Sequence, residues 1–361
     1  METAAQTQAL SGKRKLRVLT INPAMMPSVV IGALRPLAEL EKTGEISLGV
    51  RLSRDWRKDD IDWADVVVFY RNQELTDVDA LYLACERGKG VIYEIDDNFF
   101  EIPLDLPLGR FHREPRRLHA LKRFLQYADL VRVYSQTMLQ QTVQFGAPVE
   151  LVRSYFDASL IAREKRRIPR PGEPVEIAFA SGRSPDPGVE RAMHQSLARL
   201  CDTHGDKVRI TFWRKPPPGL EGRKQIRRRQ PLANYDAFVR QFYKSGFDIG
   251  LAPVLDDAFH NSKTNNKYRE YGGCGVAGIY SDVELYRACV THRANGMLAE
   301  NTPESWYACL AQLVQEPELR RSIAAAARSD VLQNYTFENA VSTWRLHLAC
   351  VRDLSGAEAA A

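Results

Sequence analysis

Short apolar runs alternate along this chain with longer stretches in which apolar residues recur at helical spacing. The runs predict buried strands at 16–24, 64–71, 90–97, 130–135 and 148–154, and then again at 175–182, 208–213, 247–254 and 276–281. Predicted helices separate them at 31–43, 78–88, 117–128, 136–145, 189–203 and 235–245. Apolar strands that alternate with helices are typical of parallel sheets covered on both faces. The pattern therefore predicts an α/β fold.

The alternation is interrupted once, at the charged and proline-rich segment 158–174, which we interpret as a linker between two domains. The expected organisation follows from the strand and helix pattern on either side of it. It comprises a disordered tail (1–15), an N-terminal domain (16–157), the linker (158–174), a C-terminal domain (175–335), a C-terminal helix (336–354) and a second disordered tail (355–361). Thr302–Pro303, Pro317 and Thr336 are predicted to begin the last three helices.

Composition excludes several classes of protein. No apolar run approaches the ~18 residues of a membrane-spanning helix, and the N-terminus lacks the apolar core of a secretory signal. The six cysteines show no zinc-site spacing, and neither a GxGxxG nor a GxxxxGK[ST] motif occurs. The net charge of +5 permits an anionic partner without identifying one. The basic run 222–230 is interpreted as a solvated loop, with an anionic membrane or a polyanionic acceptor as alternatives, and no motif supports nucleic acid.

The segment 247–282 predicts a strand, a helix and a second strand. Lys263, Lys267 and Glu270 follow each other at helical spacing, so we expect them to share one face of that helix. Together with the helix N-terminus and backbone donors near 261–265, the two ammonium groups could hold a pyrophosphate. The alternative is a surface cluster of lysines and a glutamate with little energetic consequence.

Asp96 and Asp97 end the predicted strand 90–97. Two carboxylates at this position could orient an acceptor hydroxyl or take its proton. They could instead cap the next helix, or bind a divalent metal. No metal site is predicted.

Four segments together resemble a known group of enzymes: 262–283 (SKTNNKYREYGGCGVAGIYSDV), 295–306 (NGMLAENTPESW), ADVVVFYR and YEIDD. The second half of the chain resembles the donor-binding domain of GT-B glycosyltransferases, and is most similar to glycosyltransferase family 4. The resemblance covers about residues 16–350. It implies two Rossmann-like α/β/α domains that face each other across a cleft, an acceptor-binding N-terminal domain, a donor-binding C-terminal domain and a last helix that crosses back.

The resemblance also implies roles for single residues. Glu270 takes the place of the second glutamate of the E-x7-E motif, which holds the donor ribose, whereas Ser262 stands where the first glutamate is expected. Arg183 matches the arginine of a GR-x5-K pattern against the diphosphate, but Val189 stands where its lysine would be. The donor-binding residues we expect are Arg183, Ser262, Lys263, Asn265, Asn266, Lys267 and Glu270.

The stretch after the first strand supplies further candidates. Ser28, Gly32 and Arg35 could line the cleft near the phosphates or the acceptor, although an ordinary strand-to-helix turn is an equal alternative.

The expected function is transfer of a sugar from a nucleotide-diphosphate sugar to the hydroxyl of a carbohydrate or lipid-linked glycan, with retention of configuration and without a metal or other cofactor. Such a hexosyl- or related transferase would serve surface polysaccharide or glycoconjugate synthesis, in the cytoplasm or peripherally at the inner face of the membrane. A nucleotide-sugar epimerase and an inactive nucleotide-sugar-binding subunit are the alternatives.

Overall fold

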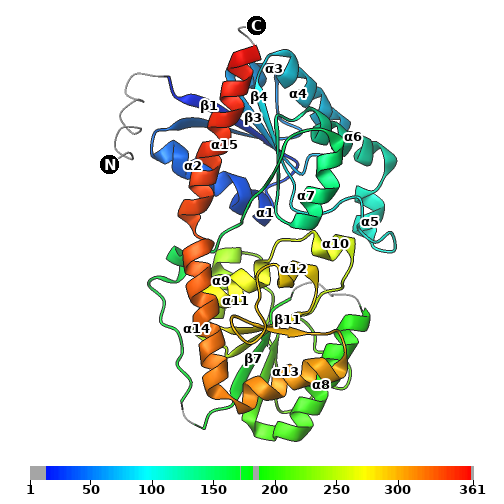
Figure 1. Ribbon diagram of the computed structural model, residues 1–361, viewed down its shortest axis with the longest axis vertical. Helices are drawn as coiled ribbons and strands as arrows, with labels where there is room; N and C mark the ends of the chain where they lie inside the picture. Colours follow the sequence, from blue (N-terminus) through cyan, green and yellow to red (C-terminus); the bar gives the residue numbers. More distant parts are fainter. Residues whose placement is uncertain (1–13, 171, 182–186, 359–361) are drawn as a thin grey trace. The chain divides into compact units, whose positions relative to one another are not determined.

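The structure is a computed structural model that describes residues 14–170, 172–181 and 187–358. Of the predicted tails, 1–13 and 359–361 lie outside these residues. Residues 355–358 continue the last helix, so the prediction of a disordered tail is wrong for these four residues. The chain divides into two compact units, each a sheet flanked by helices (Figure 1). Unit 1 contains Met1–Val152 together with Val341–Ala361, and unit 2 contains Arg153–Ala340.

Unit 1 is built on a six-stranded parallel sheet in the order β2-β1-β3-β4-β5-β6. The chain starts at β1, moves to the adjacent edge strand β2, and then crosses the sheet to the other edge. Right-handed crossovers therefore place helices on both faces. The strands are β1 (Leu16–Asn22), β2 (Ile46–Leu52), β3 (Val66–Tyr70), β4 (Gly90–Glu94), β5 (Leu130–Val133) and β6 (Val149–Leu151).

The helices of unit 1 include one unbroken helical stretch from Pro27 to Lys42, four residues longer at its start than predicted. Its middle turn has π-helical geometry. The elements are α1 (Pro27–Val29), η2 (Val30–Leu34), α2 (Arg35–Lys42), α3 (Lys58–Trp63), α4 (Leu75–Glu86), α5 (Pro107–His112), α6 (Pro115–Tyr127), α7 (Gln136–Thr142) and η3 (Val143–Phe145).

The last helix, α15 (Phe337–Glu358), begins in unit 2 and continues in unit 1. The Thr336 hydroxyl caps it by accepting a hydrogen bond from the Asn339 N–H at 3.1 Å. In unit 1, the Trp344 indole Nε1 donates to the Gly32 carbonyl at 2.8 Å, and Arg345 pairs with Glu45 at 2.5 Å. The helix is thus fixed to the start of the unit 1 fold.

Unit 2 repeats the architecture with a second six-stranded parallel sheet, in the order β12-β11-β10-β7-β8-β9. The prediction of two Rossmann-like α/β/α units is therefore confirmed. The strands are β7 (Val175–Phe179), β8 (Val208–Phe212), β9 (Ile226–Arg228), β10 (Ile249–Ala252), β11 (Ala277–Ser281) and β12 (Met297–Ala299).

The core of unit 2 has two layers, one on each face of the sheet, because successive side chains of a strand point to opposite faces. On β7, Ile177 and Phe179 belong to one layer, and Ala178 belongs to the other. The helices of this unit are η4 (Ala158–Ile161), α8 (Pro187–His204), η5 (Gly205–Lys207), α9 (Tyr235–Ser245), α10 (Ala258–Asn261), α11 (Asn266–Gly273), α12 (Glu284–Arg287), α13 (Pro303–Gln315) and α14 (Pro317–Asn334).

Three strands were not predicted, and all three lie at sheet edges: β2, β9 and β12. An edge strand is paired on one side only and needs no continuous apolar run. β9 lies inside the basic run 222–230, which is therefore not simply a loop. Two of its five cations have acidic partners nearby: Arg223 pairs with Asp202 at 2.5 Å and Lys224 pairs with Asp206 at 2.8 Å.

The predicted linker 158–174 is not wholly an exposed connection. Leu160 and Ile161 in η4 are buried in the core layer of unit 2 that also holds Phe242. The contact-based division of the chain falls earlier, between Val152 and Arg153. Among the described residues, none of the helices combines the length and the hydropathy that crossing a membrane requires.

Candidate functional site

The first candidate site lies in unit 1, at the carboxyl-end edge of its sheet. β4 ends at Glu94, so Asp96 and Asp97 stand just beyond the strand, and Arg71 follows the neighbouring strand β3 directly. The Arg71 guanidinium joins the two acids: its Nε donates to Asp96 Oδ1, and its Nη2 donates to Asp97 Oδ2 at 2.6 Å. The three side chains are 10–16% exposed. The predicted pair of acids is thus part of a buried ionic triad.

The charge state of the triad follows from burial and from the paired charges. Burial raises the pKa of the Asp96 carboxyl, and this outweighs the opposite effect of the Arg71 cation. Burial lowers the pKa of Arg71, but the two carboxylates raise it by more, so the guanidinium stays charged. A carboxylate with a raised pKa is a better proton acceptor than an ordinary aspartate. This is the chemistry expected of a group that takes a proton from a hydroxyl.

Arg71 has a left-handed backbone, with φ at 62°. A residue with a Cβ reaches this region at a cost of roughly 1–2 kcal/mol, so its neighbours must stabilise it. The Arg71 N–H donates to the Glu94 carbonyl at 3.0 Å, which turns the side chain toward the loop after β4. The sequence predictions did not include Arg71.

The alternative that Asp96 and Asp97 cap the next helix is wrong. That helix, α5, begins at Pro107 and has Leu106 as its N-cap, and the carboxylates bind Arg71 instead.

A second buried network lies beneath the triad. Glu94 is fully buried and accepts hydrogen bonds from Arg132 Nε at 2.9 Å and from the Tyr134 hydroxyl. Burial raises the pKa of Glu94 despite the nearby Arg132 charge. A Cβ on Gly32 would stand 2.7 Å from Glu94 Oε1, so only glycine fits at this position. Gly32 therefore supports the sheet edge through close packing.

The other two residues of the predicted cleft loop also lie in the helical stretch that starts at Pro27. Ser28 is in α1 and is half-buried, and Arg35 is the first residue of α2. Gly32 and Arg35 fall within the helix predicted at 31–43, whereas Ser28 belongs to the four residues by which the helix begins earlier than predicted. A role of these residues near the phosphates or the acceptor stays a prediction.

The second candidate site lies in unit 2, after β10. The predicted single helix carrying Lys263, Lys267 and Glu270 is wrong, because the segment forms two short helices, α10 and α11, with a turn between them. Lys263 lies in this turn, with its Nζ 3.9 Å from the centre of the Phe259 ring. Only Lys267 and Glu270 are on α11, where they form an ion pair of 2.6 Å.

The helix breaks at this point because its polar side chains satisfy the ends of α10. Asp257 caps the start of α10 by accepting from the His260 N–H at 2.7 Å, and the Ser262 hydroxyl donates to the Ala258 carbonyl at its end. The backbone N–H groups of Asn261 and Lys263 donate to Asp257 and His260, respectively. Backbone donors at these two positions are therefore paired, contrary to expectation.

Asn265 and Asn266 have a structural partner that the sequence predictions missed. Their side-chain oxygens accept hydrogen bonds from the buried Arg269, at 3.0 Å from Asn265 Oδ1 to Arg269 Nε. Arg269 also donates to the Tyr155 carbonyl, so it fixes the start of α11 to the beginning of unit 2. The Asn265 amide donates to the Tyr335 hydroxyl at 3.2 Å.

Two other predicted features concern the loop after β7. Arg183 lies outside the described residues. Val189 is buried in the first turn of α8, so the position where a lysine is expected provides packing and no charge.

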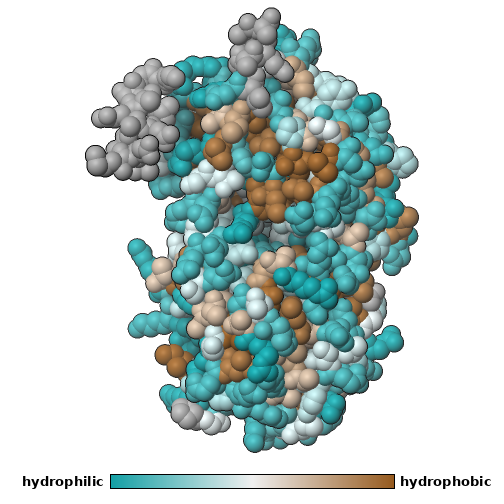
Figure 2. Space-filling model, in the orientation of Figure 1, coloured by the Kyte–Doolittle hydropathy of each residue, from teal (hydrophilic) through white to brown (hydrophobic). Residues whose placement is uncertain are grey.

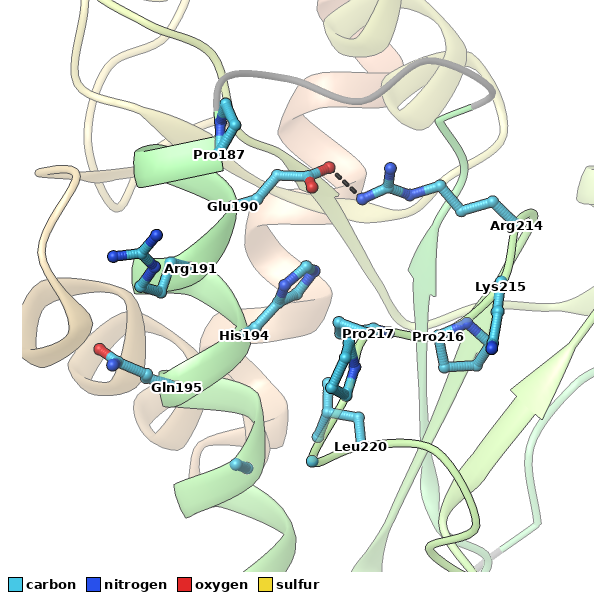
Figure 3. Close-up of a pocket in the computed structure, with 13 residues that line it drawn as sticks. Pro187, Glu190, Arg191, His194, Gln195, Arg214, Lys215, Pro216, Pro217 and Leu220 are labelled. Atoms are coloured by element: carbon cyan, nitrogen blue, oxygen red, sulfur yellow. Dashed lines mark hydrogen bonds and ion pairs between the residues drawn. The ribbon is translucent and has the colours of Figure 1, made fainter.

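A cavity of about 660 Å³ lies elsewhere in unit 2, between α8 and residues 214–220 (Figure 3). Glu190 and Arg214 form an ion pair beside it, and His194 projects from α8 toward the proline-rich loop. Burial lowers the pKa of His194 to about 4, so its imidazole is neutral near neutral pH. No described residue among the predicted donor-binding set lines this cavity.

Comparison with known proteins shows which families and solved structures this chain is similar to. Residues 183–345 match a family model described as glycosyl transferase-like. No curated protein sequence matches the chain. HepE from Anabaena, solved in complex with UDP and glucose, has a TM-score of 0.67 at 13% identity, covering 93% of this chain and 100% of HepE.

Two further solved structures show the same fold. Sucrose-phosphate synthase from Thermosynechococcus elongatus has a TM-score of 0.66 at 12% identity, covering 95% of this chain and 100% of its own. A UDP-N-acetylglucosamine 2-epimerase has a TM-score of 0.51 at 13% identity, covering 87% and 91%. The predicted two-domain GT-B fold is confirmed by these structures, and residues 183–345 are similar to the glycosyl transferase-like family, whereas the activity and the narrower assignment to family 4 stay predictions.

Proposed function

Because the GT-B fold and the glycosyl transferase-like match coincide in this chain, we propose that it transfers a sugar from a nucleoside diphosphate sugar to an acceptor hydroxyl. The observation that carries the proposal is the pair of polar sites at the carboxyl-end edges of the two sheets, where ligands of open α/β sheets bind. The HepE complex with UDP makes a uridine nucleotide the first candidate donor.

Glu270 is the proposed contact of the donor ribose. It is 7% exposed, and its Oε2 is paired with Lys267, which fixes the carboxylate in the middle of α11. A fixed carboxylate can accept hydrogen bonds from two neighbouring hydroxyls. Lys263 and Lys267, with Arg183, are proposed to stabilise the departing diphosphate by charge, without a metal.

Asp96 is the proposed group that orients or deprotonates the acceptor, with Arg71 as its positioning residue. Two observations support this assignment. The pKa of the Asp96 carboxyl is raised, and the Arg71 Nε donates a hydrogen bond directly to Asp96 Oδ1. We propose retention of the anomeric configuration, as the resemblance to family 4 implies. The acceptor is proposed to be a carbohydrate or lipid-linked glycan in surface polysaccharide or glycoconjugate synthesis, handled by a cytoplasmic enzyme with peripheral membrane contact.

A thermal-shift panel with UDP, GDP, dTDP, ADP and CMP tests the donor site. A nucleotide at about 100 times its Kd stabilises the folded protein by roughly 2.7 kcal/mol, or about 5–10 °C for a domain of this size. We expect UDP to give the largest shift and Glu270→Gln to abolish most of it. Glu318→Gln, an exposed helix glutamate, is the matched control.

A second variant decides between this site and the cavity beside α8. His194→Phe narrows that cavity and leaves α11 untouched. If His194→Phe removes the shift while Glu270→Gln keeps it, the nucleotide binds beside α8 and the proposed donor site is wrong. No shift with any of the five nucleotides also refutes the donor site.

An epimerase is the second candidate, favoured by the similarity to the 2-epimerase structure. Incubation with the UDP-sugar that binds best, followed by chromatography with and without added glycan, separates the two functions. An epimerised nucleotide sugar formed in the absence of acceptor would support the epimerase. Nucleotide binding with no turnover of any donor would support the inactive binding subunit, for which Ser262 and Val189 are the arguments.

A further inference from the structure

Unit 1 exposes a group of large apolar side chains around α5. Leu104, Leu106, Leu108 and Phe111 are 43–55% exposed, although they fall within eight consecutive residues. We call these four residues the apolar platform. Figure 2 shows hydrophobic atoms on the surface where Figure 1 places α5. Isolated exposed apolar residues are ordinary, whereas a cluster of them marks an interaction surface.

The backbone beneath the platform is fixed, so these side chains point outward because of the fold. Gly109 is buried, and a Cβ at this position would stand 1.9 Å from the Pro103 carbonyl oxygen. The Leu106 N–H donates to the same carbonyl at 3.2 Å, and the Arg113 N–H donates to the Gly109 carbonyl at 2.9 Å. The loop is therefore closed on itself and cannot turn its leucines inward without breaking these contacts.

Phe111 is held in place from the neighbouring helix. The guanidinium carbon of Arg117, in the first turn of α6, lies 3.8 Å from the centre of the Phe111 ring. Arg117 is itself buried and pairs with Glu74. The ring is thus kept in a defined orientation at the surface.

Positive charge surrounds the platform. Residues 101–123, which include the platform, contain six cations and three acids, which gives a net charge of +3 (six minus three). One of the acids, Asp105, lies between two leucines of the platform. Arg116 pairs with Glu114 at 2.8 Å, but its side chain remains 61% exposed. Arg110, Arg116 and Lys122 are exposed. A surface that joins apolar side chains to a local excess of cations is complementary to an anionic lipid bilayer.

The inner side of the same loop leads toward the Arg71 triad. The His112 ring stacks on Phe99 with centres 4.3 Å apart, and its Nδ1 lies 2.5 Å from Gln73 Oε1. Phe99 in turn lies 5.6 Å from the guanidinium carbon of Arg71. Two side chains in series, His112 and Phe99, therefore connect the loop of the platform to the proposed acceptor site.

We propose that the apolar platform and the cations of residues 107–123 dock unit 1 on an anionic phospholipid bilayer. The leucines and Phe111 enter the interface, and Arg110 and Arg116 contact the lipid phosphates. The purpose of this docking rests on the proposed function: a bilayer contact beside the Arg71 triad would bring a lipid-linked acceptor to Asp96. The docking itself does not depend on sugar transfer.

Vesicle co-sedimentation of the full chain tests the proposal, with phosphatidylcholine vesicles alone or with added phosphatidylglycerol. We expect binding to the anionic vesicles, and weaker binding as salt is raised. Each exposed cation contributes about 1 kcal/mol at such a surface, so R110Q/R116Q should lower the partition coefficient by roughly 30-fold. L106S/L108S should lower it by at least about tenfold, since each leucine loses most of its transfer free energy.

Two matched controls keep the result specific. Ile168→Ser removes a single apolar side chain that is 84% exposed outside the platform, and R227Q/R228Q removes two cations from the basic run 222–230. Both controls should bind as the unchanged chain does. If R227Q/R228Q loses binding and R110Q/R116Q does not, the basic run is the membrane contact and the proposal is wrong.

If the chain binds neither kind of vesicle, the docking proposal is wrong, even if the platform binds another partner. The nucleotide thermal shift is measured on the same variants. A retained shift together with lost vesicle binding shows that the membrane contact and the donor site are separate. Vesicle binding without any nucleotide shift would leave the docking intact and refute the proposed function.

Discussion

Replacing Arg71 removes a cation that two buried carboxylates share. Asp96 and Asp97 are 10% and 16% exposed, and each accepts a hydrogen bond from a different nitrogen of Arg71. Loss of one partner from a buried ion pair costs about 3–5 kcal/mol, because the remaining charge stays buried. Since these side chains keep some exposure, we expect Arg71→Ala to lower the free energy of unfolding of unit 1 by about 3 kcal/mol.

The backbone of residue 71 separates the side-chain effect from the effect of conformation. Alanine at φ 62° keeps the left-handed strain, whereas glycine adopts this conformation freely. Arg71→Gly should therefore be more stable than Arg71→Ala by roughly 1 kcal/mol, although both lack the guanidinium. Arg71→Lys keeps the charge but cannot reach both carboxylates in a fork, so it should fall between Arg71→Ala and the unchanged chain.

The pH dependence has a definite sign. Burial raises the pKa of Asp96 above its unfolded value, so its contribution to stability is present at low pH and is lost as pH rises through the folded pKa. Without Arg71, both carboxyl groups lose the cation that favours ionisation. The stability deficit of Arg71→Ala should therefore be larger at neutral pH than at about pH 5.

Urea unfolding followed by circular dichroism and tryptophan fluorescence measures this deficit, with the two units allowed separate transitions. Arg54→Ala, at a side chain 81% exposed, is the control and should change stability by less than about 0.5 kcal/mol. A deficit below about 1 kcal/mol for Arg71→Ala, or one equal at both pH values, would refute the account of the triad.

Two further variants probe the network under the triad, and both are measured by the same unfolding assay. Gly32→Ala places a Cβ 2.7 Å from Glu94 Oε1 and 2.8 Å from the Tyr70 ring, and should cost about 1–3 kcal/mol by overpacking; a neutral effect would mean that the helix shifts freely. Tyr134→Phe removes a donor from buried Glu94 and should cost about 1–3 kcal/mol. Because the pKa of the Glu94 carboxyl is already raised, the stability lost in Tyr134→Phe should be smaller at low pH. Tyr127→Phe, at an exposed ring, is the control and should have no effect.

The fold could be predicted from the sequence wherever a strand is buried on both faces. Strands such as β3 (VVVFY) and β4 (GVIYE) are wholly buried and have the apolar runs that central parallel strands require. The edge strand β2 reads ISLGVRL and is mostly half-exposed, so its pattern does not separate it from a loop. Helix starts could be predicted where the sequence contains a recognisable N-cap residue, such as Thr302, whose hydroxyl accepts a hydrogen bond from the Ser305 N–H.

The donor segment shows where such patterns fail. Lys263, Lys267 and Glu270 fit helical spacing, but local capping by Asp257 and Ser262 ends α10 before Lys263. Side chains that bond to nearby backbone compete with helix continuation, and a count of apolar and charged positions does not capture this.

The position of Arg71 follows from the sheet topology, even though the sequence predictions overlooked it. In unit 1 the strand order reverses around β1, whose neighbours are β2 and β3, and in unit 2 it reverses around β7, whose neighbours are β10 and β8. Ligands of such sheets bind beyond the carboxyl ends of the strands at this reversal. Arg71 follows β3 directly, whereas the Lys263 turn lies further beyond β10, after the short helix α10. A charged residue at the end of a strand beside the reversal of strand order is therefore a candidate site residue. It can be found from the strand order alone, once adjacent apolar runs are assigned as neighbouring strands. Variants of Arg71 and Glu270 thus test one rule in two separate units.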